Sequence, residues 1–227
     1  MNKFYIIGIG YRPLDEKASY VISRADVILA TERLAGVFKR YDEFDDVKGK
    51  LKVTGNIFET MDYLRNNYEK EKISVLADGD PMFFGFGRQV LKEFDKGAVE
   101  IIPDLSSMQI AFSRIKEPWG EAFLISLHGG PDPHKRRKLE YEITDIPELL
   151  EKHSIIGILT DRINNPSEIA GFLNSSPLTR NLLLTFYVCE RLGYSDEKIT
   201  EGKPEYIATH TFLYPNVVII RKNDRND

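Results

Sequence analysis

The chain has 227 residues, of which 42% are hydrophobic and 29% are charged, as in ordinary soluble globular proteins. Its formal net charge is -4, and acidic and basic residues are mixed along the chain, so we do not expect nucleic acid, whose phosphates attract a broad cationic surface, as the main partner. The single cysteine, Cys189, excludes an intrachain disulfide and a multi-cysteine metal site. No apolar run suits a signal peptide or a membrane-spanning helix, so we expect a cytoplasmic protein.

The first half of the chain alternates short apolar runs with longer amphipathic segments. The apolar runs have strand length, and the segments between them carry apolar residues at three- and four-residue spacing, which is typical of helices. This alternation predicts βαβ units and a mainly parallel sheet flanked by helices. The expected strands are residues 4–9, 26–30, 73–77 and 99–102, and the expected helices are residues 15–24, 57–68, 86–94 and 106–115.

A second α/β domain is expected after the segment Lys116-Glu117-Pro118-Trp119-Gly120, because its proline and glycine interrupt the periodicity. We place the boundary there, with a first domain of residues 1–117 and a second of residues 118–227. The pattern of the second half predicts a mixed sheet with some antiparallel pairing. Its expected strands are residues 122–127, 155–160, 182–188 and 216–220, and a helix is expected after Pro166. The fold class is therefore α/β with two α/β domains.

Ligands bind at the carboxyl ends of parallel strands, so the loops after the predicted strands are the candidate sites. In the first loop, Gly8 and Gly10 permit close backbone approach, but the third glycine of a dinucleotide fingerprint is absent, and a plain tight turn explains the pair equally well. In the second loop, residues 78–87, a carboxylate at Asp80 could accept hydrogen bonds from ribose hydroxyls or an ammonium group, beside phenylalanines that line an apolar slot. Capping of the following helix by Asp80 is the simpler alternative.

The third loop ends in two hydroxyl residues at the expected start of a helix. Ser106 or Ser107 could bind the carboxylate of a ligand there, helped by backbone N–H groups of the first helical turn. Capping of the helix explains them about as well. All three loops belong to one edge of one sheet, which favours a bound nucleotide-like ligand.

Three sequence blocks resemble the tetrapyrrole (corrin/porphyrin) methylase family. They are Gly-Asp-Pro-x-Phe-x-Gly-x-Gly-Arg at 79–88, Pro-x-x-Ser-Ser-x-Gln-x-Ala-Phe at 103–112 and Ser-Leu-His-Gly at 126–129. Within that family they are most similar to the subgroup that methylates C5 of a corrin-ring precursor of vitamin B12. The resemblance implies two α/β domains, S-adenosylmethionine held in the cleft between them, and a homodimer. It also implies a separate partner protein that methylates C15 and decarboxylates an acetate side chain.

The resemblance also implies roles for particular residues. It assigns no catalytic residue and no metal ligand, because an electron-rich ring carbon can itself be the nucleophile. His128 is a candidate for contact with substrate carboxylates, with a structural histidine as the alternative. The residues implied to bind S-adenosylmethionine are Gly10, Asp80, Phe83, Ser106, Ser107, Leu127, Thr160 and Cys189, and those implied to bind substrate are Arg12 and His128.

The chain departs from the family pattern at three places. Tyr11-Arg12-Pro13 replaces the end of the usual Gly-x-Gly-Pro-Gly loop, and Asp104 stands where glycine is common. The third is a long segment, residues 130–146, whose basic run His134 to Lys138 would dock corrin carboxylates or form a solvated surface loop. These departures leave open another branch of the fold, methylating a different ring carbon or a protein histidine as diphthine synthase does. A non-catalytic corrinoid or nucleotide-binding module is a further alternative.

Overall fold

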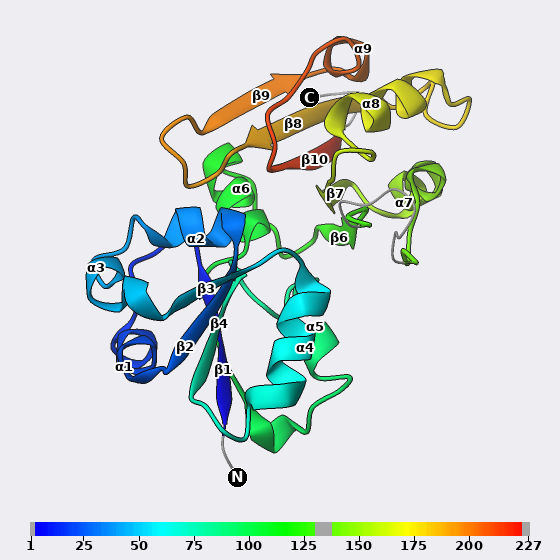
Figure 1. Cartoon of the computed structure of the whole chain (residues 1–227). Coiled ribbons are helices and arrows are strands. Elements are labelled where there is room, and N and C mark those ends of the chain that lie inside the picture. Colours follow the sequence, from blue (N-terminus) through cyan, green and yellow to red (C-terminus); the bar gives the residue numbers. More distant parts are fainter. Residues whose placement is uncertain (1–2, 130–137, 224–227) are drawn as a thin grey trace. The chain divides into compact units, whose positions relative to one another are not determined.

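The computed structural model describes residues 3–129 and 138–223 (Figure 1). Contacts within the chain group it into two compact units, Met1–Ser106 and Ser107–Asp227. Both units are α/β, which confirms the predicted fold class. Helix α6 (Ser107–Ile115) belongs to the second unit, whereas the sequence placed the boundary after residue 117.

The first unit is built on a five-stranded parallel sheet with the order β3-β2-β4-β1-β5. Every neighbouring pair in it runs parallel, which confirms the mainly parallel sheet expected from the alternation of strands and helices. Its strands are β1 (Phe4–Ile9), β2 (Val27–Thr31), β3 (Leu51–Thr54), β4 (Ile73–Asp78) and β5 (Val99–Ile102).

Helices cover both faces of this sheet, as buried parallel strands require. Helices α1 (Glu16–Arg24), α2 (Glu32–Phe38) and α3 (Phe44–Val47) lie on one face, and α4 (Ile57–Asn67) and α5 (Gly87–Val90) lie on the other (Figure 1). Strand β1 supplies both faces because successive side chains alternate. Its Phe4 and Ile6 are fully buried and belong to the core on the α4 side.

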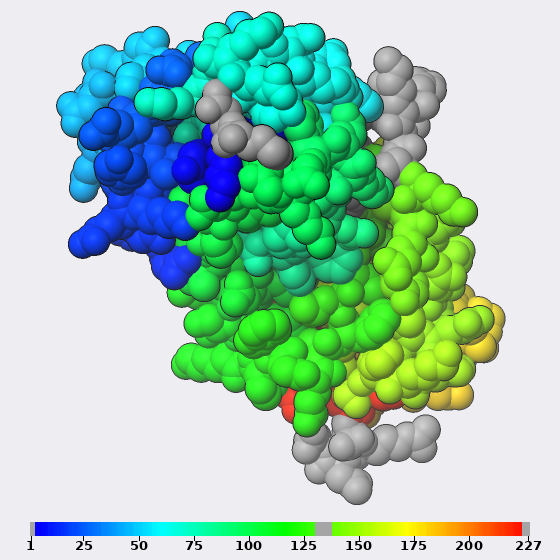
Figure 2. All heavy atoms as spheres, turned by 90° about the horizontal axis from the view of Figure 1, so that it is seen from below, coloured from blue at the N-terminus to red at the C-terminus, as the bar shows by residue number. Residues whose placement is uncertain are grey.

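Aromatic rings close the edge of this sheet at the amino ends of its strands. Phe4 makes edge-to-face contacts with Tyr68 and Phe94, with ring centroids 6.0 and 5.1 Å apart. Seen from this side, the start of β1 is packed between the cyan atoms of α4 and green atoms from the β5 region (Figure 2). Glycine-rich and polar loops are found instead at the opposite, carboxyl edge.

The second unit contains a mixed five-stranded sheet with the order β6-β7-β10-β8-β9. Strands β6 and β7 are parallel and the remaining neighbours are antiparallel, which confirms the predicted mixed sheet with some antiparallel pairing. Its strands are β6 (Phe123–Ser126), β7 (Ile155–Leu159), β8 (Leu183–Glu190), β9 (Lys198–Gly202) and β10 (Asn216–Asn223), and its other helices are α7 (Ile146–Lys152), α8 (Pro166–Ser175) and α9 (Pro204–Ile207).

A fully buried core joins this sheet to α7, α8 and α9. Helix α6 packs against it at Gly157 in β7, where an added Cβ would lie 2.7 Å from the sulfur of Met108. None of the helices in the described ranges is long and apolar enough to cross a membrane.

Candidate functional site

Strand order brings the loops after β4, β1 and β5 side by side at the carboxyl edge of the first sheet. Backbone hydrogen bonds tie them together, since the N–H of Gly79 donates to the carbonyl of Ile9 at 3.0 Å and the N–H of Asp104 donates to the carbonyl of Gly79 at 3.3 Å. We call these three loops, residues 8–13, 79–86 and 103–106, the rim. They are the three loops in which the sequence placed a ligand site.

Glycines let the rim loops approach one another more closely than side chains allow. A Cβ on Gly8 would lie 1.9 Å from the carbonyl oxygen of Gly79 and 2.5 Å from the amide nitrogen of Asp104. Gly79 itself has φ +55°, and a Cβ there would lie 2.6 Å from the carbonyl oxygen of Leu105. At these glycines the rim loops therefore meet through backbone atoms, and we call these contacts the backbone cradle.

Gly10 adopts a backbone conformation, φ +135°, that L side chains rarely adopt. Its N–H donates a hydrogen bond of 2.6 Å to the hydroxyl oxygen of Tyr41, which follows α2. Burial, more than any other cause, raises the pKa of Tyr41, so the hydroxyl stays neutral at physiological pH. Sequence reasoning missed Tyr41, because no local pattern reveals a partner 31 residues away.

Asp80 is partly exposed at the rim, and its two carboxylate oxygens have different surroundings. Oδ1 accepts a hydrogen bond of 2.8 Å from the N–H of Met82, which is the local turn that the simpler interpretation expected. Oδ2 accepts no hydrogen bond from any residue that the structure describes. The nearby carboxylate of Asp78 is instead paired with Arg33 at 2.7 Å. Asp80 thus retains an open hydrogen-bond acceptor at the rim.

The other rim positions named from the sequence differ in accessibility. Phe83 is partly exposed and contacts Phe84 edge to face, with ring centroids 4.9 Å apart. Ser106 is buried at the end of the third loop. Ser107 begins α6 and so belongs to the second unit.

The two departures from the family pattern in the rim contact each other. Asp104, whose side chain is 5% exposed, accepts hydrogen bonds through Oδ2 from the backbone N–H groups of Tyr11 at 2.7 Å and Arg12 at 3.2 Å. Its Oδ1 accepts from Nε of Arg12 at 2.8 Å and from the N–H of Leu105 at 2.7 Å. The altered first loop is therefore anchored by the altered residue of the third loop.

Three of the side chains predicted to bind the donor in the second unit are buried and take part in packing or pairing. Leu127 is fully buried in the core with α7 and α8. The Thr160 hydroxyl oxygen lies 2.6 Å from both the carbonyl and the side-chain oxygens of Asn216. Cys189 is also fully buried, and burial, helped by nearby Glu197, raises the pKa of its thiol to about 12.

The Ser-Leu-His-Gly loop after β6 is held by two residues that sequence reasoning missed. Asp161 accepts hydrogen bonds from the N–H groups of Gly129 at 2.8 Å, Ile163 at 2.9 Å and Asn164 at 2.8 Å. The side-chain amide of Asn164 donates to the carbonyl of Leu127 at 2.8 Å. His128, between these anchored residues, is partly exposed. The signal for Asp161 was its position directly after the predicted strand at 155–160.

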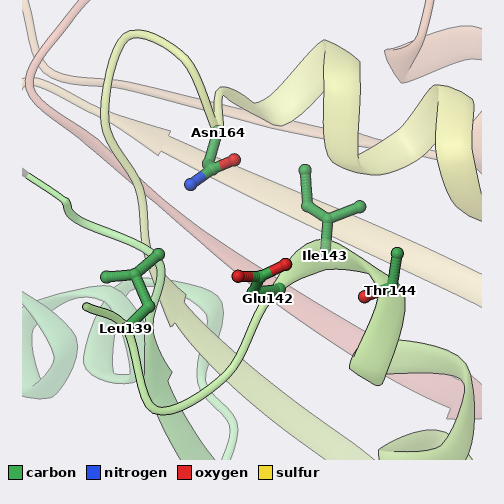
Figure 3. Close-up of a pocket in the computed structure, with 5 residues that line it drawn as sticks. All are labelled: Leu139, Glu142, Ile143, Thr144 and Asn164. Carbon is green, nitrogen blue, oxygen red and sulfur yellow. The ribbon is translucent and has the colours of Figure 1, made fainter. Parts of the chain in front are cut away.

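A cavity of about 260 Å³ lies beside this loop in the second unit. Asn164 projects into it opposite Glu142 and Leu139 (Figure 3). None of the residues predicted to bind cofactor or substrate lines it. Most of the predicted basic run, His134 to Arg137, lies outside the described residues, so its docking role stays a prediction.

The sequence profile of the family described as tetrapyrrole (corrin/porphyrin) methylases matches residues 3–208. The chain belongs to this family. It is 30% identical over 221 residues to a probable cobalt-precorrin-7 C5-methyltransferase from Methanocaldococcus jannaschii, a match that covers 95% of this chain and 96% of that protein. It is also 30% identical over 128 residues to a precorrin-6Y C5,15-methyltransferase (decarboxylating) from Sinorhizobium sp, which covers 56% of this chain and 28% of that protein.

Solved structures of tetrapyrrole methylases share the fold. A precorrin-6Y methylase from Archaeoglobus fulgidus superposes with a TM-score of 0.67 at 21% identity, covering 98% of this chain and 99% of that one. A uroporphyrin-III C-methyltransferase from Thermus thermophilus, solved with S-adenosylhomocysteine, gives a TM-score of 0.66 at 18% identity, covering 96% and 92%.

Proposed function

We propose that this chain transfers a methyl group from S-adenosylmethionine to C5 of cobalt-precorrin-7 in cobalamin biosynthesis. The likeness to the Methanocaldococcus jannaschii relative over nearly both whole chains carries this proposal. The positions of the resemblance blocks also support it, since residues 79–88 and 103–112 begin in rim loops and residues 126–129 begin at the last residue of β6.

Two observations on the rim fit the methyl donor. The first is the close backbone packing at Gly8 and Gly79, together with the positive φ of Gly10, which leaves backbone atoms and no side chain at these three rim positions. The second is the open oxygen of Asp80, a charged acceptor suited to ribose hydroxyls or the donor's ammonium group. The partly exposed Phe83 of the same loop would supply an apolar surface.

The second unit is proposed to complete donor binding mainly through its backbone. Ser107 would offer an N–H group at the start of α6. The side chains of Leu127, Thr160 and Cys189 are buried, so a contact of these residues with the donor would use their backbone atoms.

Methyl transfer from a sulfonium is an in-line displacement in which a ring carbon of the substrate attacks the methyl carbon and the C–S electron pair stays on sulfur. The chain's residues therefore have to bind, align and exclude water more than they have to react. Arg12 and His128 are proposed to contact carboxylates of the corrin precursor.

The family resemblance also supports a wider proposal about assembly. The name of the Sinorhizobium sp relative couples C5 and C15 methylation with decarboxylation, and the match covers 28% of that protein. We propose a separate C15 methyltransferase and decarboxylase as the partner of this chain. A homodimer and a cytoplasmic location remain predictions.

The proposal is tested by incubating the purified protein with S-adenosylmethionine and either cobalt-precorrin-7, its cobalt-free form or uroporphyrinogen III. We expect the mass of one methyl group to be added to cobalt-precorrin-7, with NMR placing it at C5. Methylation at another carbon, or of uroporphyrinogen III alone, would assign the chain to another branch of the family. Binding of S-adenosylhomocysteine without transfer to any of the three would favour a non-catalytic module.

A further inference from the structure

We propose that Asp104 is a positioning residue that holds the guanidinium of Arg12 ready to bind a carboxylate of an acidic ring substrate. This inference rests on the proposed function. It adds a determinant of substrate affinity that is separate from the rim residues proposed to bind the methyl donor. On this inference, the end of the first rim loop and the third rim loop together recognise tetrapyrroles that carry several carboxylates.

The environment of Asp104 is built to hold a neighbouring loop. Its side chain is 5% exposed, and its carboxylate accepts three backbone N–H groups and one guanidinium N–H. Two of those backbone groups belong to Tyr11 and Arg12, so Asp104 fixes the path of the first loop where Arg12 leaves it. Charge-assisted bonds to a buried carboxylate are strong, and this arrangement satisfies the carboxylate without the substrate.

One edge of the Arg12 guanidinium is held by the protein, and the other is open. Nε donates to Asp104 and Nη2 lies 3.4 Å from the carbonyl of Pro103, so both contacts use the side-on edge of the guanidinium. Nη1 makes no hydrogen bond to any residue in the described part of the chain. The side chain is 55% exposed, which leaves the end-on edge of Nη1 and Nη2 for a carboxylate with bidentate geometry.

The chemistry of this pair distinguishes arginine from lysine. A lysine ammonium keeps the positive charge but lacks the second edge that would let it bind Asp104 and a substrate carboxylate in one fixed geometry. Asp104→Asn replaces one acceptor oxygen by an NH₂ group. Because both carboxylate oxygens of Asp104 accept from N–H groups, the NH₂ group would face a donor in either orientation of the amide. In both variants the side chain at position 12 should therefore lose its fixed orientation, while the rim residues proposed to bind the methyl donor stay in place.

The experiment compares Arg12→Lys, Asp104→Asn and the double variant in the methyl-transfer assay. We expect KM for cobalt-precorrin-7 to rise about tenfold in each, as loss of an oriented charge-assisted pair implies, with kcat changed by less than about twofold. The double variant should be no worse than the single ones, because the two residues act as a unit. The Kd of S-adenosylhomocysteine, measured by calorimetry, should change by less than about threefold.

Arg65→Lys is the matched control. Arg65 also donates through Nε to a carboxylate, Glu93, at 2.8 Å, and its side chain is 45% exposed. It lies near the carboxyl end of α4, and hence at the edge of the sheet opposite the rim, because helices in βαβ units run antiparallel to the strands. All kinetic constants should stay at wild-type values in this variant.

Unchanged KM in Arg12→Lys, or additive effects in the double variant, would overturn the inference. So would a loss of S-adenosylhomocysteine affinity as large as the rise in KM, since Asp104 would then only maintain the rim.

Binding of cobyrinic acid and of its fully esterified form separates this inference from the proposed function. If the enzyme does not methylate cobalt-precorrin-7 but binds cobyrinic acid more tightly than the ester, and Arg12→Lys removes the difference, the proposed function fails and the carboxylate element stands. Equal binding of acid and ester by the wild type would overturn the carboxylate element, whatever the methylation result.

Discussion

The rim of the first sheet and the loops after β6 and β7 in the second sheet are held in partly different ways. In the first unit, the loops meet through backbone atoms at Gly8 and Gly79, and the buried carboxylate of Asp104 also holds the first loop. In the second, buried polar side chains such as Asp161 and Thr160 tie the strand ends together. Both places thus use one buried aspartate, Asp104 or Asp161, to hold backbone N–H groups of a loop, but only the rim adds backbone contacts too close for a side chain.

The largest expected effect is on the backbone cradle. Gly8→Ala should lower the free energy of unfolding by about 3 kcal/mol or more, because its Cβ would overlap backbone atoms that cannot move away as a side-chain tip can. Urea denaturation measures this change. Gly36→Ala is the control, since Gly36 lies in α2 with nothing within 4 Å of an added Cβ, and it should stabilise by about 0.5–1 kcal/mol. Equal effects of the two substitutions would show that the rim is not tightly packed.

A somewhat smaller loss in the free energy of unfolding is expected when Asp161, the side-chain anchor of the second unit, is replaced. Asp161→Ala should cost about 2–3 kcal/mol, because it removes the acceptor of three backbone N–H groups around a residue that is 4% exposed. Asp161→Asn should cost less, since its oxygen can still accept from Ile163 and Asn164. Hydrogen exchange of the Gly129 amide should quicken in both variants. Wild-type stability of Asp161→Ala would refute the anchoring role.

The smallest expected effect concerns the Cys189 thiol, whose folded pKa is raised to about 12 by burial. An unfolded thiol ionises near pH 8.5, so the thiol's contribution to stability is intact below that pH and is lost as the pH rises toward 12. Wild-type protein should therefore lose about 1 kcal/mol between pH 8 and 9.5 relative to Cys189→Ala. Denaturation curves at both pH values test this, and parallel losses in the two proteins would contradict it.

Strong local patterns made much of the fold predictable. Strands β1 and β4 are buried along most of their length and read as continuous apolar runs, and helices α1 and α4 carry apolar residues at helical spacing. Strand β3 escaped prediction because it is a short edge strand with exposed Lys52 and Val53, and β9 is likewise a short, largely polar edge strand.

The candidate site was predictable only in part. The glycines and Asp80 are visible in the sequence because turn residues directly follow an apolar strand. Tyr41 and the bond between Asp104 and Arg12 were not visible, because they join segments far apart in the chain. Burial of Thr160 was equally hidden, since residue type alone does not tell a lining side chain from one used in packing.

Calorimetric titration of S-adenosylhomocysteine into Asp80→Asn and Asp95→Asn tests most directly whether the rim binds the methyl donor. Each aspartate accepts the N–H of the residue two positions later, at 2.8 Å for Asp80 and 2.7 Å for Asp95, but Asp95 precedes β5 at the opposite edge of the sheet. We predict a loss of affinity of about tenfold or more for Asp80→Asn and wild-type affinity for Asp95→Asn, because only the first removes a charged acceptor from the donor. Wild-type affinity in Asp80→Asn, or equal losses in the two variants, would contradict the account.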